Sequence, residues 1–251
     1  MTGSDAASVS AVASLVALIP ARAGSVRVPG KNVRELAGHP LLAYSIAAAQ
    51  ESELFDAVLV STDSEQTAEV ARHYGAEVPG LRPPELAGST SPDIDWIEHI
   101  LRGTAYDAFS ILRPTSPFRR GATIRRAWEA FTAVRDADSL RAVRPAREHP
   151  GKMWVLEGEL MRPLLPQPKG EIPTHSRQTA ALPAVHVQDS SLEIAWTRIV
   201  AQREIAGRRV VPFLTGGAEG FSIDYPEDWE AAEQLAAAHP QSLPPDPGRA
   251  S

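Results

Sequence analysis

Three positively charged residues and two glycines share one short stretch of the chain, directly after an apolar run. The stretch, residues 18–32, reads LIPARAGSVRVPGKN, and its cations are Arg22, Arg27 and Lys31. Glycine lets the backbone approach a phosphate closely, and three cations can neutralise much of the charge of a triphosphate. The pattern therefore favours a phosphate-binding loop. The plain alternative is a solvated basic turn, because short motifs of this kind recur by chance.

The segments on either side of this loop decide between the two interpretations. Residues 14–20, SLVALIP, form a continuous apolar run ended by proline, which is typical of a strand buried on both faces. Residues 40–50, PLLAYSIAAAQ, have helical spacing. In an open parallel sheet the first strand-to-helix loop commonly holds phosphate. This context favours the phosphate site.

Strands and helices alternate through the next hundred residues. Strands are expected within 56–63, 107–117 and 138–143, and helices within 64–75, 93–103 and 121–134. Such alternation implies a mostly parallel sheet with right-handed crossovers. The predicted fold class is therefore α/β, with a mostly parallel twisted sheet and helices on both faces.

The rhythm changes at about residue 148. Residues 148–192 are rich in proline and short strand-like pieces, and we expect an inserted β-rich excursion that covers a site or pairs with a second subunit. Residues 221–238 are expected to close the domain with a strand end and a helix that begins at Pro226. The predicted organisation is a flexible lead-in over 1–13, one domain over 14–238 and a loose proline-rich tail over 239–251.

Composition excludes several classes of site and partner. The chain of 251 residues contains no cysteine, so disulfides, thiolate metal sites and a cysteine nucleophile are excluded. A formal net charge of −6 argues against a nucleic-acid or anionic-membrane surface. The N-terminus lacks a basic leader region, and its apolar run is too short to span a bilayer. We expect a cytoplasmic protein with neither nucleic acid nor membrane as a partner.

The loop has the order A-R-x-G-S-x-R-x-P-G-K-N, which is neither a Walker A loop nor a GxGxxG fingerprint. It resembles the signature of the sugar-acid cytidylyltransferases, the family of CMP-N-acetylneuraminate and CMP-Kdo synthetases. The resemblance continues in order through VSTDSEQTAEVARHYGAEV, LRPPELA, RPTSPFR, SLRAVRPAREHPGKMW and FSIDYPEDW. It implies a Rossmann-like, homodimeric, Mg²⁺-dependent nucleotidyltransferase. Such an enzyme transfers CMP from CTP to the anomeric hydroxyl of an acidic sugar and releases pyrophosphate.

The same resemblance assigns residues to the nucleotide. Arg22, Lys31 and Asp224 are implied as the catalytic residues. For Arg82 an ion pair with Glu85 is an equally simple interpretation. The implied nucleotide-binding residues are Arg22, Ala23, Gly24, Ser25, Arg27, Lys31, Asn32, Arg82, Arg113, Thr115 and Ser116.

Arg113 is where the chain departs from the family pattern, because members that resemble the sialic acid enzymes usually have glutamine there. Glutamine both donates and accepts hydrogen bonds, whereas arginine only donates. Bidentate arginine is also the usual way to read guanine, so the nucleobase stays open. The alternative is that Arg113 pairs with a nearby carboxylate. At the end of the strand within 56–63, Asp63 could contact nucleotide, although a helix cap is the preferred interpretation.

The metal and sugar sites are implied by the same comparison. The family's D-x-D metal segment appears here as Ser222-Ile223-Asp224, which leaves Asp224 as the Mg²⁺ ligand and makes a two-carboxylate site doubtful. Asp228, in the first turn of the next helix, is expected to stabilise the helix dipole. The acidic sugar is assigned to Arg177 and Gln178, with Gln188, Ser191 and Glu193 lining its pocket.

Two alternatives remain at this point. One keeps the reaction type but uses another nucleotide, such as GTP, or another acceptor, such as a phosphonate. The other is a nucleotide-binding paralogue without catalysis, which kept the fold after losing a metal ligand at position 222, where Ser222 now stands. The intact loop cations and Asp224 argue against it.

Overall fold

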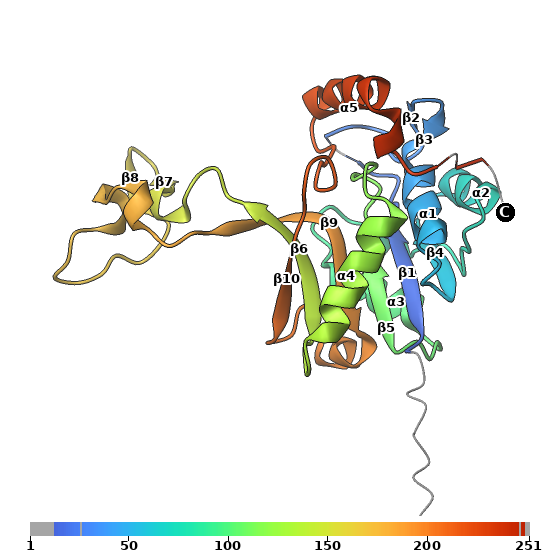
Figure 1. The fold of residues 1–251 in the computed structure, drawn as a ribbon, viewed down its shortest axis with the longest axis horizontal. Helices are drawn as coiled ribbons and strands as arrows, with labels where there is room; N and C mark the ends of the chain where they lie inside the picture. Colours follow the sequence, from blue (N-terminus) through green and yellow to red (C-terminus); the bar gives the residue numbers. More distant parts are fainter. Residues whose placement is uncertain (1–12, 26, 246, 249–251) are drawn as a thin grey trace, which may run out of the picture.

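The computed structural model describes residues 13–25, 27–245 and 247–248. A six-stranded sheet lies at its centre, with the strand order β10-β6-β9-β5-β1-β4 (Figure 1). Five of its strands run parallel and β9 runs antiparallel between β5 and β6. The prediction of a mostly parallel α/β sheet is thus confirmed. The expected lead-in falls almost wholly on residues outside the described chain.

The elements have the following bounds. The strands of the central sheet are β1 (Leu15–Pro20), β4 (Ala57–Ser61), β5 (Ala108–Ile111), β6 (Ser139–Pro145), β9 (His186–Trp196) and β10 (Val210–Leu214). Two small antiparallel pairs are β2 (Glu35–Leu36) with β3 (His39–Pro40), and β7 (Trp154–Glu157) with β8 (Leu160–Pro163). The helices are α1 (Leu41–Ser52), α2 (Glu65–His73), α3 (Asp93–Leu101), α4 (Gly121–Ala133) and α5 (Pro226–Ala238). Short 3₁₀ turns are η1 (Pro84–Leu86), η2 (Pro150–Lys152), η3 (Thr174–Ser176), η4 (Thr179–Ala181), η5 (Thr197–Gln202) and η6 (Pro240–Ser242).

Helices cover both faces of the sheet because its central strands are apolar on both sides. In β1, Ala17 and Ile19 pack with α1, α2 and α4, whereas Val16 and Leu18 pack with α3 and η5. All four side chains are fully buried. A third cluster, around Trp229 of α5, closes the end of the molecule where the loop after β1 lies, here called the phosphate loop (residues 21–32) after its predicted role. No helix within the described ranges is long and apolar enough to cross a membrane.

The ends of the domain differ in part from expectation. The four strands predicted before residue 148 all appear, but β10 was not predicted, because Pro212 interrupts its apolar run. Proline is tolerated there because β10 lies at the edge of the sheet. The strand end expected at 221–224 is irregular backbone, fixed by the Ile223 N–H, which donates to the Thr115 carbonyl over 2.8 Å.

The C-terminal residues are not the loose tail that we expected, as far as they are described. Leu243 is buried in the third cluster, which also contains Trp229 of α5, and η6 precedes it directly. The physical reason is that Leu243, an apolar side chain in this polar, proline-rich stretch, packs against the hydrophobic surface of the third cluster. The domain therefore extends beyond residue 238.

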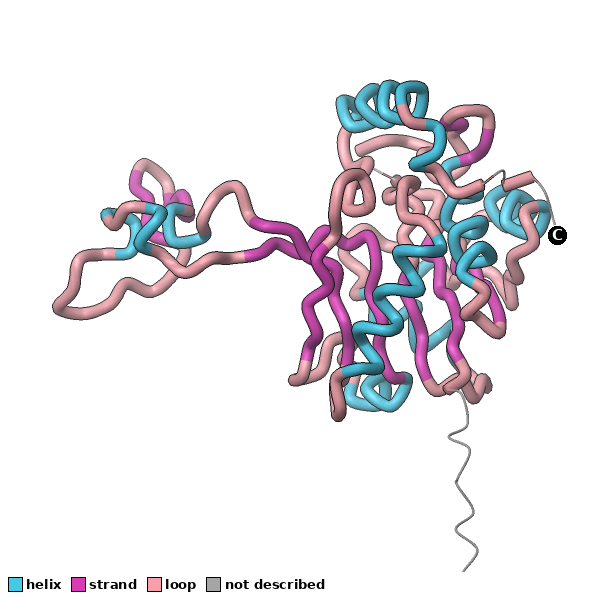
Figure 2. The backbone as a smooth tube through the Cα atoms, in the orientation of Figure 1, coloured by secondary structure: helices cyan, strands magenta, loops and turns pink. Residues whose placement is uncertain are grey.

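The excursion leaves the sheet after β6 and returns in β9. Residues 146–185, here called the arm, project away from the domain and carry β7 and β8 (Figures 1 and 2). The predicted limit of 192 is too late, because β9 pairs with β6 from His186 onwards. The pairing of β6 with β9 shifts register between Arg141 and Val143, and Ser190 opposite this bulge has a left-handed backbone, with φ 62°.

Candidate active site

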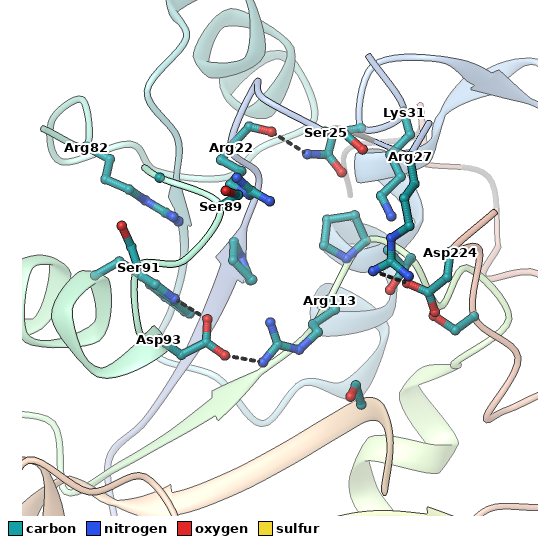
Figure 3. Close-up of a pocket in the computed structure, with 18 of the residues that line it drawn as sticks. Arg22, Ser25, Arg27, Lys31, Arg82, Ser89, Ser91, Asp93, Arg113 and Asp224 are labelled. Atoms are coloured by element: carbon teal, nitrogen blue, oxygen red, sulfur yellow. Dashed lines mark hydrogen bonds and ion pairs between the residues drawn. The ribbon is translucent and has the colours of Figure 1, made fainter. Parts of the chain in front are cut away.

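A cavity of about 390 Å³ opens at the carboxyl ends of β1 and β5 (Figure 3). Of the predicted nucleotide-binding residues, Ala23, Gly24 and Ser116 do not line it. The predicted residues that do line it are Arg22, Ser25, Arg27, Lys31, Asn32, Arg82, Arg113, Thr115 and Asp224. The structure therefore brings together residues that are up to two hundred positions apart in the chain.

The phosphate loop is held in shape by hydrogen bonds to its own backbone. The Asn32 amide donates to the Arg22 carbonyl over 3.0 Å, and the Asp63 carboxylate accepts from the Ala23 N–H over 2.8 Å. Asp63 is thus not the cap of α2, as we had expected. That role belongs to Ser64, whose hydroxyl accepts from the Thr67 N–H. Asp63 instead ties the loop to the end of the neighbouring strand.

Two loop cations donate to neutral carbonyl groups. The Lys31 ammonium donates to the Ile223 carbonyl over 2.9 Å, and the Arg22 guanidinium to the Ala87 carbonyl over 3.3 Å. Burial lowers the pKa of Lys31 below its ordinary value of 10.5. Arg27 lies 3.7 Å from the Asp224 carboxylate, with both side chains well exposed. Most of the positive charge of the loop is therefore available to an anionic ligand.

Arg82 is buried at the other end of the cavity. Its Nε donates to the Ser61 hydroxyl and its Nη2 to the Ser61 carbonyl, both over 2.9 Å. The guanidinium lies over the Trp96 ring, 5.1 Å from the ring centroid. Burial lowers the pKa of Arg82 to about 10. The ion pair with Glu85 that the sequence left open is not formed within the described chain, because Arg82 is turned towards the sheet.

Arg113 pairs with two carboxylates, which is one of the two interpretations that the sequence allowed. Its Nη2 lies 2.6 Å from Asp93 and 3.0 Å from Glu193. Glu193 also forms an ion pair with Arg141. Arg113 still contributes to the cavity wall, with 23% of its side chain exposed. The charge of Arg113 is therefore largely balanced before any ligand binds.

The residues assigned to the sugar do not come together. Glu193 and Ser191 are buried within β9, at 2% and 1% exposure, and neither they nor Gln188 line a described cavity. Arg177 pairs with Glu171 over 2.6 Å in the arm, and Gln178 precedes η4 there. The reason is the geometry of the arm, which carries its residues away from the sheet (Figure 2).

A second cavity of about 820 Å³ adjoins the first, and Ser222 and Asp224 line both. It lies at the base of the arm, against Arg144 and Arg147 on one side and Tyr225 on another. Our sequence analysis did not single out these two arginines. A usable signal was present, because Arg144 follows directly on a predicted strand and Arg147 lies three residues later, within the segment SLRAVRPAREHPGKMW.

Asp224 is placed to hold a metal ion, although no cage is formed around it. Its side chain is 41% exposed and contacts Arg27. The Asp228 carboxylate has another role, because its Oδ2 accepts hydrogen bonds from the N–H groups of Asp224 and Tyr225, both over 2.8 Å, at the start of α5. Among the described residues there is no group of three or more histidine, aspartate or glutamate side chains that could hold a metal ion. One exposed carboxylate at the junction of two cavities could hold Mg²⁺, which usually takes one or two carboxylates together with substrate phosphates.

Comparisons with known proteins identify relatives that are cytidylyltransferases. A family model described as cytidylyltransferase matches residues 16–93. The CMP-N,N'-diacetyllegionaminic acid synthase of Legionella pneumophila is 35% identical over 238 residues, which covers 91% of this chain and 99% of the relative. The N-acylneuraminate cytidylyltransferase of Escherichia coli O18:K1:H7 is 46% identical over 121 residues, 48% of this chain and 29% of the relative.

Among solved structures, a CMP:2-keto-3-deoxy-manno-octonic acid synthetase complexed with CTP superimposes with a TM-score of 0.68 at 15% identity. The match covers 90% of this chain and all of that one, and it shows the shared fold. The relationship along almost the full length of the first relative, together with the cation-lined cavity, shows that this chain belongs to the sugar-acid cytidylyltransferase family and is a nucleotidyltransferase.

Proposed function

We propose that this enzyme transfers CMP from CTP to the anomeric hydroxyl of a nonulosonic acid and releases pyrophosphate. One observation carries the proposal: two cavities meet at Asp224, one that contains the loop cations Arg22, Arg27 and Lys31 and one that is larger and mixed in character. CTP would occupy the first and the sugar acid the second. The names of the relatives, which include a legionaminic acid synthase, support this choice of acceptor.

Catalysis would consist of alignment and charge neutralisation. Lys31 and Arg22 would bind the phosphates, and the fixed loop would hold the α-phosphate towards the second cavity. The sugar hydroxyl would attack the α-phosphorus while the bond to pyrophosphate breaks. No covalent enzyme intermediate is required, which agrees with a chain that has no cysteine.

Asp224 would hold the Mg²⁺ ion that the family resemblance implies. The fit rests on its oxygen donors, its exposure and its place where the two cavities meet. When bound, Mg²⁺ would neutralise phosphate charge that builds up on the leaving group. Ser222, which stands where the family has a first aspartate, lines both cavities and offers only a neutral hydroxyl.

The second cavity has suitable chemistry for an acylated sugar acid. Arg144 and Arg147 would bind the carboxylate, since a guanidinium can bind a carboxylate through two parallel hydrogen bonds. Met153, Val187 and Phe221 give apolar surface for acyl groups. These residues replace Arg177 and Gln178 of the same chain as the proposed sugar contacts.

We also propose that the arm forms a homodimer. It carries large apolar side chains in the open, with Leu156 and Leu160 each 78% exposed and Ile172 66% exposed. Such a surface is costly in water unless a partner covers it. Light scattering should give twice the mass of one chain, and a monomer at working concentration would contradict the proposal. We propose that the enzyme acts in the cytoplasm.

The decisive experiment measures pyrophosphate release from CTP and Mg²⁺ with a panel of acceptors. The panel contains legionaminic, pseudaminic and N-acetylneuraminic acids, Kdo and a simple phosphonate. We expect release with one or more nonulosonic acids. Release with the phosphonate alone would change the acceptor class, and tight CTP binding without release for any acceptor would favour a paralogue without catalysis.

A further inference from the structure

The cavity that would receive a polyanionic nucleotide contains two carboxylates among its lining residues, Asp93 and Asp224. They lie at opposite ends in Figure 3, with Asp224 beside Arg27 and Lys31 and with Asp93 beside Ser91 and facing Arg113. A carboxylate in such a cavity repels phosphate and lowers the affinity for a nucleotide, unless it binds a metal ion or another part of the ligand. The proposed metal accounts for Asp224. Asp93 needs a separate explanation.

Asp93 is held in place by two donors. It begins α3, its Oδ1 accepts the Trp96 indole N–H over 2.8 Å, and its Oδ2 accepts from Arg113 over 2.6 Å. Burial raises the pKa of Asp93, but the charge and hydrogen bond of Arg113, together with the Trp96 hydrogen bond and the charge of Arg82, lower it below its ordinary value. Each carboxylate oxygen has a second acceptor position, so the group can still accept a hydrogen bond from a ligand.

The neighbours of Asp93 form a corner that suits a nucleobase. Arg82, fixed by Ser61, lies over the Trp96 ring, and the same indole donates to Asp93. The corner therefore presents a donor group and an ionised acceptor close together. The phosphate-binding cations Arg22 and Lys31 belong to the loop after β1, so the base would extend from there into this corner (Figure 3).

The hydrogen-bonding edge of cytosine matches this arrangement. Cytosine carries an amino group that donates, next to a ring nitrogen and a carbonyl that accept. Uracil has a carbonyl oxygen where cytosine has its amino group, as thymine does. Arg82 can donate to the acceptors of either base. At the position of the cytosine amino group Asp93 can accept a hydrogen bond, whereas uracil presents a carbonyl oxygen there, which the negative charge of Asp93 would repel. The ring N–H of uracil lies at the neighbouring position, where cytosine instead has a ring nitrogen that can accept from Arg82.

We propose that Asp93 is the residue that selects cytosine over uracil, with Arg113 as a positioning residue that holds its carboxylate. The proposal rests on the proposed use of a cytidine nucleotide by this site. It also gives Arg113 a different role from the direct base contact considered from the sequence. Arg113 acts on the base through Asp93, because its Nη2 is already shared between Asp93 and Glu193.

The test is the ratio of kcat/KM for CTP to that for UTP in the wild type and in Asp93→Asn. The amide can turn its NH₂ towards the uracil oxygen, so the variant should accept both bases. We expect the ratio to fall about tenfold or more, with the value for UTP rising. The matched control is Asp95→Asn on the same helix, which removes a carboxylate paired with Arg203 outside the cavity and should leave the ratio unchanged.

A role in stability alone would lower kcat/KM for both nucleotides alike and leave the ratio intact. That result, in a variant whose thermal unfolding matches the wild type, would overturn the proposal. Arg113→Met should lower the ratio as well, and Arg113→Lys should restore part of it by keeping a cation beside Asp93.

Equilibrium binding of CMP and UMP separates this proposal from the proposed reaction. If the wild type prefers CMP and Asp93→Asn loses the preference, base selection by Asp93 stands even when no acceptor yields pyrophosphate. If the enzyme releases pyrophosphate from CTP but Asp93→Asn keeps the full preference for CMP, the proposed function stands and the role of Asp93 is refuted.

Discussion

The cations of the phosphate loop and the arginines of the sheet differ in what holds them. In the loop, Lys31 and Arg22 donate to backbone carbonyls. In and beside the sheet, Arg141 of β6 and Arg113, which lies two residues after β5, both pair with Glu193, which is nearly inaccessible to solvent. A carbonyl fixes the position of a cation without cancelling its charge, whereas a carboxylate does both. The charge of Lys31 and Arg22 therefore stays available for a ligand, whereas the charge of Arg113 and Arg141 is used in ion pairs with a residue of β9.

Breaking the sheet cluster should give the largest effect, and it should appear in stability. In Glu193→Ala, Arg113 and Arg141 lose their shared carboxylate while still largely buried. The free energy of unfolding should fall by about 3–5 kcal/mol, as for other broken buried ion pairs. Denaturant unfolding monitored by tryptophan fluorescence measures it.

The matched control for that variant is Glu157→Ala in the arm. Glu157 pairs with Arg162 over 2.5 Å, but both side chains are more than half exposed. Its loss should change stability by less than about 1 kcal/mol. Equal effects of the two substitutions would mean that the sheet cluster is no more important than a surface pair.

Breaking the loop should instead affect turnover. Lys31→Ala removes a cation whose hydrogen-bond acceptor is a neutral carbonyl, so we expect kcat/KM for CTP to fall by about 10²–10³, as when one charge-stabilising donor is removed. The unfolding transition should stay close to that of the wild type. Lys169→Ala, in the arm, serves as the control for loss of charge alone. Unchanged CTP binding by calorimetry would remove Lys31 from the phosphate site.

Asp224→Asn tests the carboxylate that the two cavities share. A neutral amide is a much weaker ligand for a hard cation, so the Mg²⁺ concentration for half-maximal turnover should rise by about tenfold or more. The fold should be unaffected because the Asp224 side chain is 41% exposed and its ion pair is with Arg27, which is also exposed. Normal turnover at limiting Mg²⁺ would show that the metal is held elsewhere.

The smallest expected effect concerns pH. Burial lowers the pKa of Lys31, so its proton is lost at a lower pH than 10.5, the ordinary value for lysine. The affinity for CTP, which needs the cationic form, should therefore weaken as the pH rises through the alkaline range below that value. Lys31→Arg stays charged and should show a flatter profile. Identical profiles, measured by titration calorimetry, would assign the pH dependence to another group.

The sequence was sufficient to predict those parts of the molecule that are built from consecutive residues. The run from residue 14 to 20 and the loop after it could be predicted because burial and charge are concentrated in consecutive residues. Asp93 could not be assigned in this way, and for Arg144 and Arg147 only their place after a predicted strand was available, because their position depends on how α3 and the end of β6 face the same edge of the sheet. Arg113 shows the same limit, since both interpretations were available until its neighbours were known.

Strand β9 connects the arm with the wall of the site. It begins at His186, at the base of the arm, and continues without interruption through Asp189 and Ser190 into the centre of the sheet. Asp189 lines the second cavity and Ser190 the first. The arm and the walls of both cavities therefore share one stretch of backbone, with the bulge at Ser190 between them. The docking of another molecule on the arm would act on both cavities through this backbone, and the bulge is the place where the strand would bend.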